Sequence, residues 1–263
     1  MTFMIAPLVL ADNVGSRCVP VVTLALIAAC VLVHAGNALA LGGSEQITAF
    51  YGVNDAAIMT AFELGDVAII MSRLSRIFVY MFMHTGWLHL LGNMIGILAF
   101  GPALEERLGR LKFFALFVAG GIVAAVCYVA WYVLTSKYLP GTVTIGASPA
   151  VFAMMGAYLL LWPNATLYGF LLPLPLLLKV KAFWVIWFTA LLQVFEGLAL
   201  PDQSWFGDGH NRLAHLFGLT AGILLAWLAH RLNWLEPLSE AGERKTIVQR
   251  FVVPLLARKF TKD

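Results

Sequence analysis

Long apolar stretches separated by short polar segments make up most of the chain. Six of these stretches predict helices: roughly Val19 to Leu41, Leu88 to Leu104, Phe113 to Leu134, Pro149 to Trp162, Phe183 to Leu200 and Leu213 to Leu232. A helix needs about 20 apolar residues to cross a bilayer, and fewer where protein surrounds its ends. The fourth stretch is short, which suits a helix buried among the others with its N-terminus below the membrane surface. The pattern therefore predicts an all-α integral membrane protein built as a bundle of six transmembrane helices.

Two further apolar segments lie between these stretches and are not predicted to cross the membrane. The segment LYGFLLPLPLLLKVK carries Pro173 and Pro175, which favour a connector lying against the bundle over a seventh helix. The segment DVAIIMSRLSRIFVYMF precedes the second stretch and mixes apolar with basic residues. This mixture indicates a helix half-sunk at the membrane interface.

The composition is that of a membrane protein. Of the 263 residues, 61% are hydrophobic and 12% are charged, whereas soluble domains are about 45–50% apolar and about 25% charged. The net charge of +3 indicates no nucleic-acid partner, because the basic residues lie in loops and in the tail. Cys18, Cys30 and Cys127 have no metal-ligand or CxxC spacing, so we expect no metal site, no disulfide and no cofactor. The first dozen residues lack a basic region, so we expect no cleavable signal peptide.

The basic residues are distributed unequally between the two sides of the predicted bundle. If the first helix leaves the cytoplasm, thirteen lysines and arginines lie in cytoplasmic segments and four lie outside, namely Arg73, Arg76, Lys137 and Arg212. Since cytoplasmic loops carry the excess of basic residues, both termini are predicted to be cytoplasmic. We expect a short N-terminus (1–18), a membrane domain (19–232) with a long outward first loop (42–84), and a basic tail (233–263) lying on anionic lipid. We expect the protein to reside in a bacterial inner membrane.

Polar groups within the predicted spans fall into three clusters at about the same depth on the outer side. His89 and Asn93 are four residues apart and share one face of the second helix, with His84 just outside it. Ser148 lies at the start of the fourth helix, and His215 lies just inside the outer end of the sixth. Ionisable and polar residues are rare inside membranes, so each indicates a functional site. Together they indicate a hydrolase.

The chemistry of peptide hydrolysis assigns a role to each of these residues. A serine hydroxyl is a weak nucleophile until a base removes its proton, and His215 is the candidate base for Ser148. The attacked carbonyl develops an oxyanion, for which the candidate donors are the Asn93 amide, the His89 imidazole and the Ser148 backbone N–H. Phe152, one turn after Ser148, lies on the same face and is placed to stack against His215.

The same residues can instead have purely structural roles. Ser148 can be an N-cap that satisfies the amides of the first helical turn, with Pro149 at the first helical position. A histidine within a span can be a packed, hydrogen-bonded residue, and Asn93 can make an interhelical hydrogen bond. Six glycines are interpreted as close-packing positions between helices: Gly86, Gly92, Gly96, Gly156, Gly218 and Gly222.

The motifs around these residues resemble those of the rhomboid intramembrane serine proteases. HTGWLHLLGN is similar to the H-x-x-x-N element of that family, carried here by His89 and Asn93. GASPAVFAMMGAY resembles its GxSx element, with Gly146 as the glycine and Ser148 matching the nucleophile, and AHLFG resembles its AHxxG element, with His215 matching the base. The resemblance extends from about Arg76 to Arg231. It implies a six-helix core of the rhomboid type, a Ser-His dyad without aspartate, and cleavage of the membrane segments of other proteins.

Other positions relate less directly to the family pattern. GPALEERLG is similar to the loop after the second helix of the family, in which Glu105 matches the usual acid. Ser75-Arg76 stands where the family often shows Trp-Arg, and Pro149 stands where it usually shows glycine. Neither departure removes a member of the dyad.

Three functions are consistent with the sequence. The first is an intramembrane endopeptidase that cuts single-span membrane proteins near their outer end. The second is an inactive relative that binds membrane-protein clients, and the third is a small transporter. A transporter typically shows internal repeats and acidic groups at mid-membrane depth, whereas here only Glu196 lies in a span, near a helix end.

Overall fold

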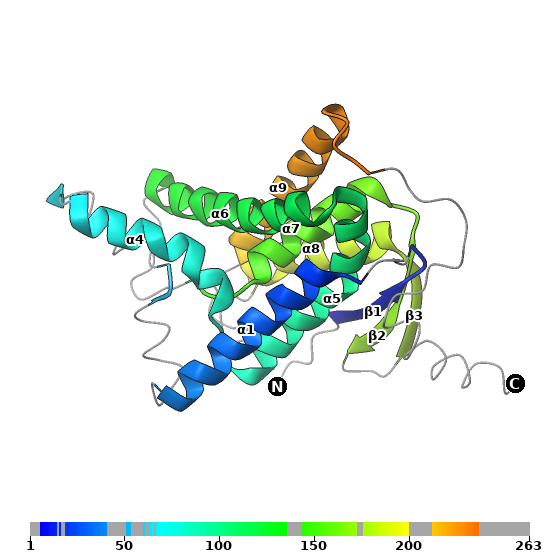
Figure 1. The fold of residues 1–263 in the computed structure, drawn as a ribbon, viewed down its shortest axis with the longest axis horizontal. Helices are drawn as coiled ribbons and strands as arrows, with labels where there is room; N and C mark the ends of the chain where they lie inside the picture. Colours follow the sequence, from blue (N-terminus) through cyan, green and yellow to red (C-terminus); the bar gives the residue numbers. More distant parts are fainter. Residues whose placement is uncertain are drawn as a thin grey trace, which may run out of the picture.

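Helices form most of the structure, and a small antiparallel sheet lies beside them (Figure 1). The computed structural model describes residues 6–14, 16, 19–40, 51–53, 60, 64–65, 67–135, 144–172, 176–199 and 212–236. The elements in chain order are β1 (Ala6–Asp12), α1 (Val21–Ala40), α4 (Val67–Val79), the 3-10 helix η1 (Tyr80–Phe82), α5 (Trp87–Leu108), α6 (Arg110–Thr135), α7 (Ser148–Leu161), β2 (Thr166–Leu172), β3 (Leu176–Lys181), α8 (Ala182–Ala199) and α9 (Arg212–Arg231). The tail after residue 236 and most of the predicted outward loop lie outside the described residues.

Four of the described helices are long and apolar enough to cross a membrane: α1, α5, α6 and α9. Helix α7 and the apolar part of α8, residues 182–195, are shorter. The chain is therefore an integral, mostly helical membrane protein. Each of the six apolar stretches in the sequence coincides with one of these helices, and most of the predicted ends lie within about three residues of the observed ones.

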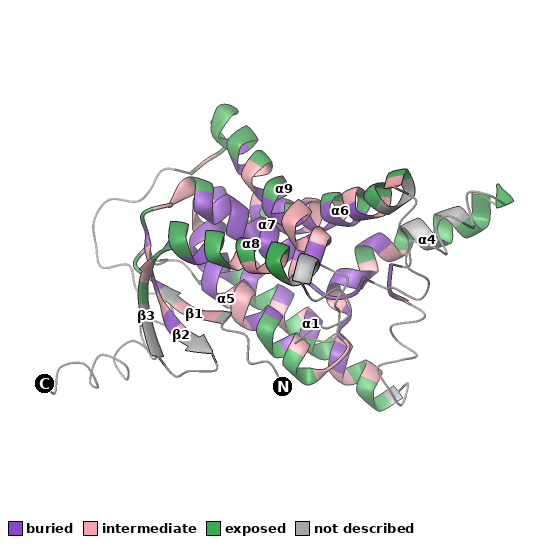
Figure 2. Cartoon of the chain, turned by 180° about the vertical axis from the view of Figure 1, so that it is seen from behind, coloured by how far each residue is buried: buried purple, intermediate pink, exposed green. Residues whose placement is uncertain are grey.

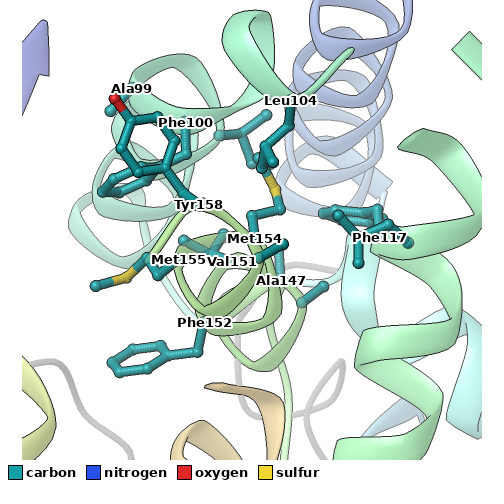
Figure 3. Packing of buried hydrophobic residues seen from close by; sticks show 14 of the residues in the cluster. Ala99, Phe100, Leu104, Phe117, Ala147, Val151, Phe152, Met154, Met155 and Tyr158 are labelled. Atoms are coloured by element: carbon teal, nitrogen blue, oxygen red, sulfur yellow. The ribbon is translucent and has the colours of Figure 1, made fainter. Parts of the chain in front are cut away.

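Helix α7 is the most enclosed helix and occupies the centre of the bundle. All its residues from Pro149 to Leu159 are buried, and Figure 2 shows its ribbon in the colour of buried residues. Side chains of α5 and α6 surround it, among them Phe100, Leu104 and Phe117 (Figure 3). A helix that is apolar on every side suits this position, because α7 has no face that must meet water.

Glycines allow α7 and α9 to approach closely. A Cβ atom would lie 2.0 Å from the Leu219 carbonyl oxygen at Gly156, 2.2 Å from that of Pro149 at Gly218, and 1.8 Å from that of Ala153 at Gly222. Small residues at these positions let the two backbones touch, as expected for helices packed in a membrane. Gly96 also faces a neighbour, Val151, so the close-packing interpretation is confirmed for four of the six glycines. It is wrong for Gly86 and Gly92, where a Cβ would meet nothing within 4 Å.

The connector before α8 forms a β-hairpin, which the apolar pattern did not predict. Strands β2 and β3 pair antiparallel, and β1 from the N-terminus adds to the free edge of β2, giving the order β1-β2-β3. The sheet is tied to the bundle by the Tyr158 hydroxyl of α7, which donates to Asp12 Oδ2 at 2.7 Å. The prediction that this segment is not a seventh helix is confirmed, but the fold is not purely helical.

Glu105 lies in a helix and not in the loop that the family resemblance implied. The segment that resembles a loop is the last part of α5, which continues to Leu108. The buried Glu105 carboxylate accepts hydrogen bonds from the backbone N–H groups of Val22 and Thr23, at 2.9 and 2.8 Å, and from the Thr23 hydroxyl at 2.8 Å. A carboxylate at this position satisfies first-turn amides of α1 and interacts favourably with the helix dipole.

Candidate active site

The turn before α7 is built around a glycine in a left-handed conformation. Gly146 has φ +113°, a value that side chains disfavour. Its backbone N–H donates to the Tyr80 carbonyl at 2.9 Å, and an isolated bridge pairs Val53 with Thr144 just before it. These bonds hold the chain so that α7 begins at Ser148, which is half-buried.

The Ser148 hydroxyl is directed at a histidine on a neighbouring helix. Ser148 Oγ lies 2.8 Å from Nε2 of His215, near the start of α9. The interpretation of Ser148 as an N-cap is wrong, because Ala147 occupies the N-cap position and no side chain caps the helix. Ser148 is the first residue of α7 and Pro149 the second, so Pro149 stands one position later than predicted. Proline is tolerated there, since first-turn amides have no acceptor within the helix.

Two further side chains hold the His215 ring. Phe152 stacks on it with ring centroids 4.5 Å apart and planes inclined by 3°, which confirms the stacking expected from the sequence. Figure 3 shows Phe152 extending from α7 away from Leu104 and Phe117. On the other side, Oε1 of Gln193 in α8 lies 2.7 Å from His215 Nδ1. Gln193 was not predicted from the sequence as a site residue, although a polar residue within an apolar span was a sufficient signal.

His89 and Asn93 of α5 face the turn that precedes Ser148. A Cβ atom at Gly146 would lie 2.7 Å from both Cε1 and Nε2 of His89 and 3.6 Å from Nδ2 of Asn93. His89 Nδ1 lies 3.1 Å from the Thr85 hydroxyl, and Asn93 Nδ2 donates to the His89 carbonyl at 3.2 Å. The structure thus brings together the residues of all three polar clusters, at the meeting point of α5, α7 and α9.

His84 is a buried neighbour of this group. Its ring centroid lies 5.2 Å from that of His89 and 6.4 Å from that of His34 in α1. Its backbone carbonyl lies 3.1 Å from Nδ1 of His34. Burial, followed by the proximity of His89 and His34, lowers the pKa of His84 from 6.5 to about 3, and only the Phe82 backbone acts in the opposite direction. His84 is therefore neutral at physiological pH.

Of the two other residues compared with the family pattern, Glu105 lies far from this group. Glu105 lies 12 residues after Asn93 in α5, which corresponds to about 18 Å along the helix axis. Arg76 lies in the last turn of α4, four residues before Tyr80, whose carbonyl accepts the hydrogen bond of the Gly146 turn. The side chain of Glu196 lies outside the described residues.

The arrangement has the parts needed for acyl transfer. A hydroxyl, an imidazole in hydrogen-bond contact with it and further donors facing the same turn are the components of nucleophilic catalysis by serine. Ser148, His89 and His215 are all half-buried rather than sealed from the surface. Within the described residues, these three side chains are therefore not sealed inside the bundle.

Comparisons with known proteins all match members of the same family. A family model described as a Rhomboid domain matches residues 71–232. The chain is similar to Rhomboid protein 1, mitochondrial, of Saccharomyces cerevisiae, with 29% identity over 56% of this chain and 39% of the yeast protein. It is similar to Rhomboid-type serine protease 2 of Yarrowia lipolytica, with 24% identity over 69% of this chain and 54% of the relative. It is also similar to RHOMBOID-like protein 5 of Arabidopsis thaliana, with 34% identity over 58% and 43%. The matched regions thus span about half or less of these relatives.

Proposed function

The chain belongs to the rhomboid family, and we propose that it is an intramembrane serine endopeptidase with Ser148 as nucleophile and His215 as general base. The observation that carries the proposal is the 2.8 Å contact between Ser148 Oγ and His215 Nε2. A serine with a base in hydrogen-bond contact is the geometry that nucleophilic catalysis requires. One relative is itself named a serine protease.

The proposed reaction proceeds in two steps through these residues. His215 Nε2 accepts the proton of Ser148 as its Oγ attacks the carbonyl carbon of a peptide bond, and the imidazolium then protonates the leaving amine. Water subsequently attacks the acyl-enzyme, with His215 again accepting the proton, and Ser148 is released. His89, Asn93 and the Ser148 backbone N–H are the proposed donors to the oxyanion, because His89 and Asn93 face the turn at Gly146 that leads into Ser148.

The proposed arrangement in the membrane has six spans, with α7 and α8 as the short ones. Both termini are cytoplasmic, in a bacterial inner membrane, and the dyad lies near the outer surface. Figures 1 and 2 support this orientation, because α4, which carries basic residues assigned to the outside, lies at the end of the molecule opposite the sheet. The proposed substrates are single-span membrane proteins, cut near the outer end of their transmembrane segments.

Two assays on the purified protein test the proposal. The first incubates it with a panel of single-span substrates and maps products by mass spectrometry. The second measures covalent labelling by a fluorophosphonate, which reports an activated serine without needing the natural substrate. We expect Ser148→Ala and His215→Ala each to reduce cleavage to background while leaving the protein folded, because members of a catalytic unit fail together.

Matched controls distinguish catalysis from folding. Ser72→Ala and His230→Ala change an exposed serine and an exposed histidine outside the site and should leave both assays unchanged. Cleavage of the same bond by Ser148→Ala would contradict the assignment. A wild type inert toward every substrate and the probe would favour the alternative, a catalytically inactive rhomboid protein that binds membrane-protein clients.

A further inference from the structure

Gln193 is a polar residue in the mostly apolar helix α8. It follows Leu192 and precedes Val194 in α8 (Ala182–Ala199), and Val194 and Phe195 are exposed at the bundle surface. Gln193 itself is half-buried, and its Oε1 lies 2.7 Å from His215 Nδ1. A carboxamide within a span is costly unless its polar atoms find partners, so this contact accounts for its orientation.

The contact completes a chain of side chains across three helices. Gln193 of α8 touches Nδ1 of His215 in α9, and Nε2 of the same ring touches Ser148 of α7, at 2.7 and 2.8 Å. The two ring nitrogens of a neutral imidazole have opposite roles, one donating and one accepting. If Gln193 accepts a hydrogen bond from Nδ1, Nε2 of the neutral ring therefore carries the lone pair and can accept a proton from Ser148.

The chemistry of catalysis requires one particular tautomer. To accept the Ser148 proton, Nε2 must carry the lone pair, so Nδ1 must carry the hydrogen. A hydrogen on Nδ1 needs an acceptor in this apolar surrounding, and the Gln193 carbonyl oxygen is in place to accept it. The opposite tautomer would direct a hydrogen at Ser148 and leave the serine without a base.

We propose that Gln193 is a positioning residue that holds His215 in the tautomer and rotation required of a base. The proposal rests on the proposed function, in which His215 activates Ser148. Phe152 sets the plane of the ring by stacking, and Gln193 selects the ring orientation that directs Nδ1 to α8 and Nε2 to Ser148. Unlike a carboxylate, the carboxamide orients the imidazole without placing a negative charge inside the membrane.

A purely structural role for the same contact makes different predictions. A bond that only holds α8 against α9 would affect thermal stability and substrate binding, and its loss would leave the rate of the chemical step unchanged. A positioning bond affects kcat and the reactivity of Ser148 toward a small probe.

The test compares three variants of the full-length protein in kcat, KM, fluorophosphonate labelling rate and thermal stability. Gln193→Leu keeps the approximate volume and removes the acceptor. Gln193→Glu keeps an acceptor oxygen at the same position. Thr189→Val is the matched control, because Thr189 lies one turn earlier in α8 and its hydroxyl donates to the Val185 carbonyl of its own helix.

We expect Gln193→Leu to lower kcat and the labelling rate by about 10- to 100-fold with KM nearly unchanged, the effect of leaving a buried donor without its acceptor. Gln193→Glu should recover most of this loss, and the acid limb of its kcat/KM profile should move to higher pH, because a carboxylate favours the protonated ring. Thr189→Val should behave as the wild type.

Two results would overturn the proposal, and they are distinguishable. If Gln193→Leu keeps the wild-type kcat and labelling rate, or changes only KM or thermal stability, Gln193 has no positioning role although the dyad stands. If wild-type labelling does not depend on Ser148, the proposed function fails and the positioning role fails with it.

Discussion

At the scale of single residues, Gly146 decides how closely the nucleophile and the oxyanion donors approach. Its φ of +113° is available to glycine at low cost, and a side chain there would enter the space occupied by the His89 ring, 2.7 Å away. Both the backbone conformation and the missing Cβ are therefore required. The same small residue lets the turn bring Ser148 next to α5.

We predict that Gly146→Ala lowers kcat by at least about 10²-fold, comparable to losing one oxyanion donor, because the new methyl group displaces His89. The measurement is the steady-state rate on a cleaved substrate, together with thermal stability. Gly92→Ala is the control, since a Cβ at Gly92 meets nothing within 4 Å. It should remain active and gain about 0.5–1 kcal/mol in stability, because alanine is favoured in helix interiors. Equal activity of Gly146→Ala and the wild type would contradict this account of the turn.

At the scale of secondary-structure elements, the contact between α7 and α9 aligns the two dyad residues. Ser148 begins α7 and His215 lies in the first turn of α9, so their 2.8 Å contact depends on the distance between the two helices. Gly218 and Gly222 permit that distance, each by lacking a Cβ that would strike a carbonyl oxygen of α7. Close packing of the two backbones thus becomes part of the catalytic geometry.

We predict that Gly222→Ala reduces activity by more than about tenfold and destabilises the protein by about 1–3 kcal/mol, the usual cost of overpacking. A Cβ at this position would lie 1.8 Å from the Ala153 carbonyl oxygen, so the helices must move apart. Activity and thermal unfolding in detergent are the measurements. Gly36→Ala in α1 serves as the control, because a Cβ there meets nothing within 4 Å. Wild-type activity in Gly222→Ala would show that the dyad tolerates helix separation.

At the scale of the whole molecule, the charge distribution and the architecture support the proposed orientation. Thirteen of the 17 basic residues lie in segments assigned to the cytoplasm, including Lys179 and Lys181 of the β3 strand. The sheet containing β3 and the helix α4 lie at opposite ends of the molecule in both views (Figures 1 and 2). In the proposed orientation, the sheet lies on the cytoplasmic side and α4 on the outer side, as the positive-inside rule favours.

We predict that a membrane-impermeant maleimide labels Met71→Cys in intact cells and labels Lys179→Cys only after the cells are permeabilised, each in a background without the natural cysteines. Both positions are exposed, Met71 on α4 and Lys179 on β3, so accessibility depends on the side of the membrane. The reverse labelling pattern would invert the topology and move the dyad to the cytoplasmic side.

The sequence by itself determined where the helices lie and which residues merit attention as a site. Helix hydrogen bonds close within four residues, and the bilayer imposes a length and an apolar composition on each span, so both features can be read locally. The candidate site residues could also be identified locally, because polar residues are rare in apolar spans. They are Ser148, His215, His89 and Asn93. Their common depth in the membrane was predicted by counting spans, without any knowledge of contacts.

Only the tertiary structure decided which partners meet across the chain. The sheet needs residues 6–12 to pair with residues 166–172, and no local pattern specifies so distant a partner. Glu105 meets the start of α1, and Gln193 meets His215, through contacts between different helices. Gly92 and Gly222 have the same local character, yet only Gly222 faces another backbone. In each case the side chain's role depends on what packs against it, which is set when the helices assemble.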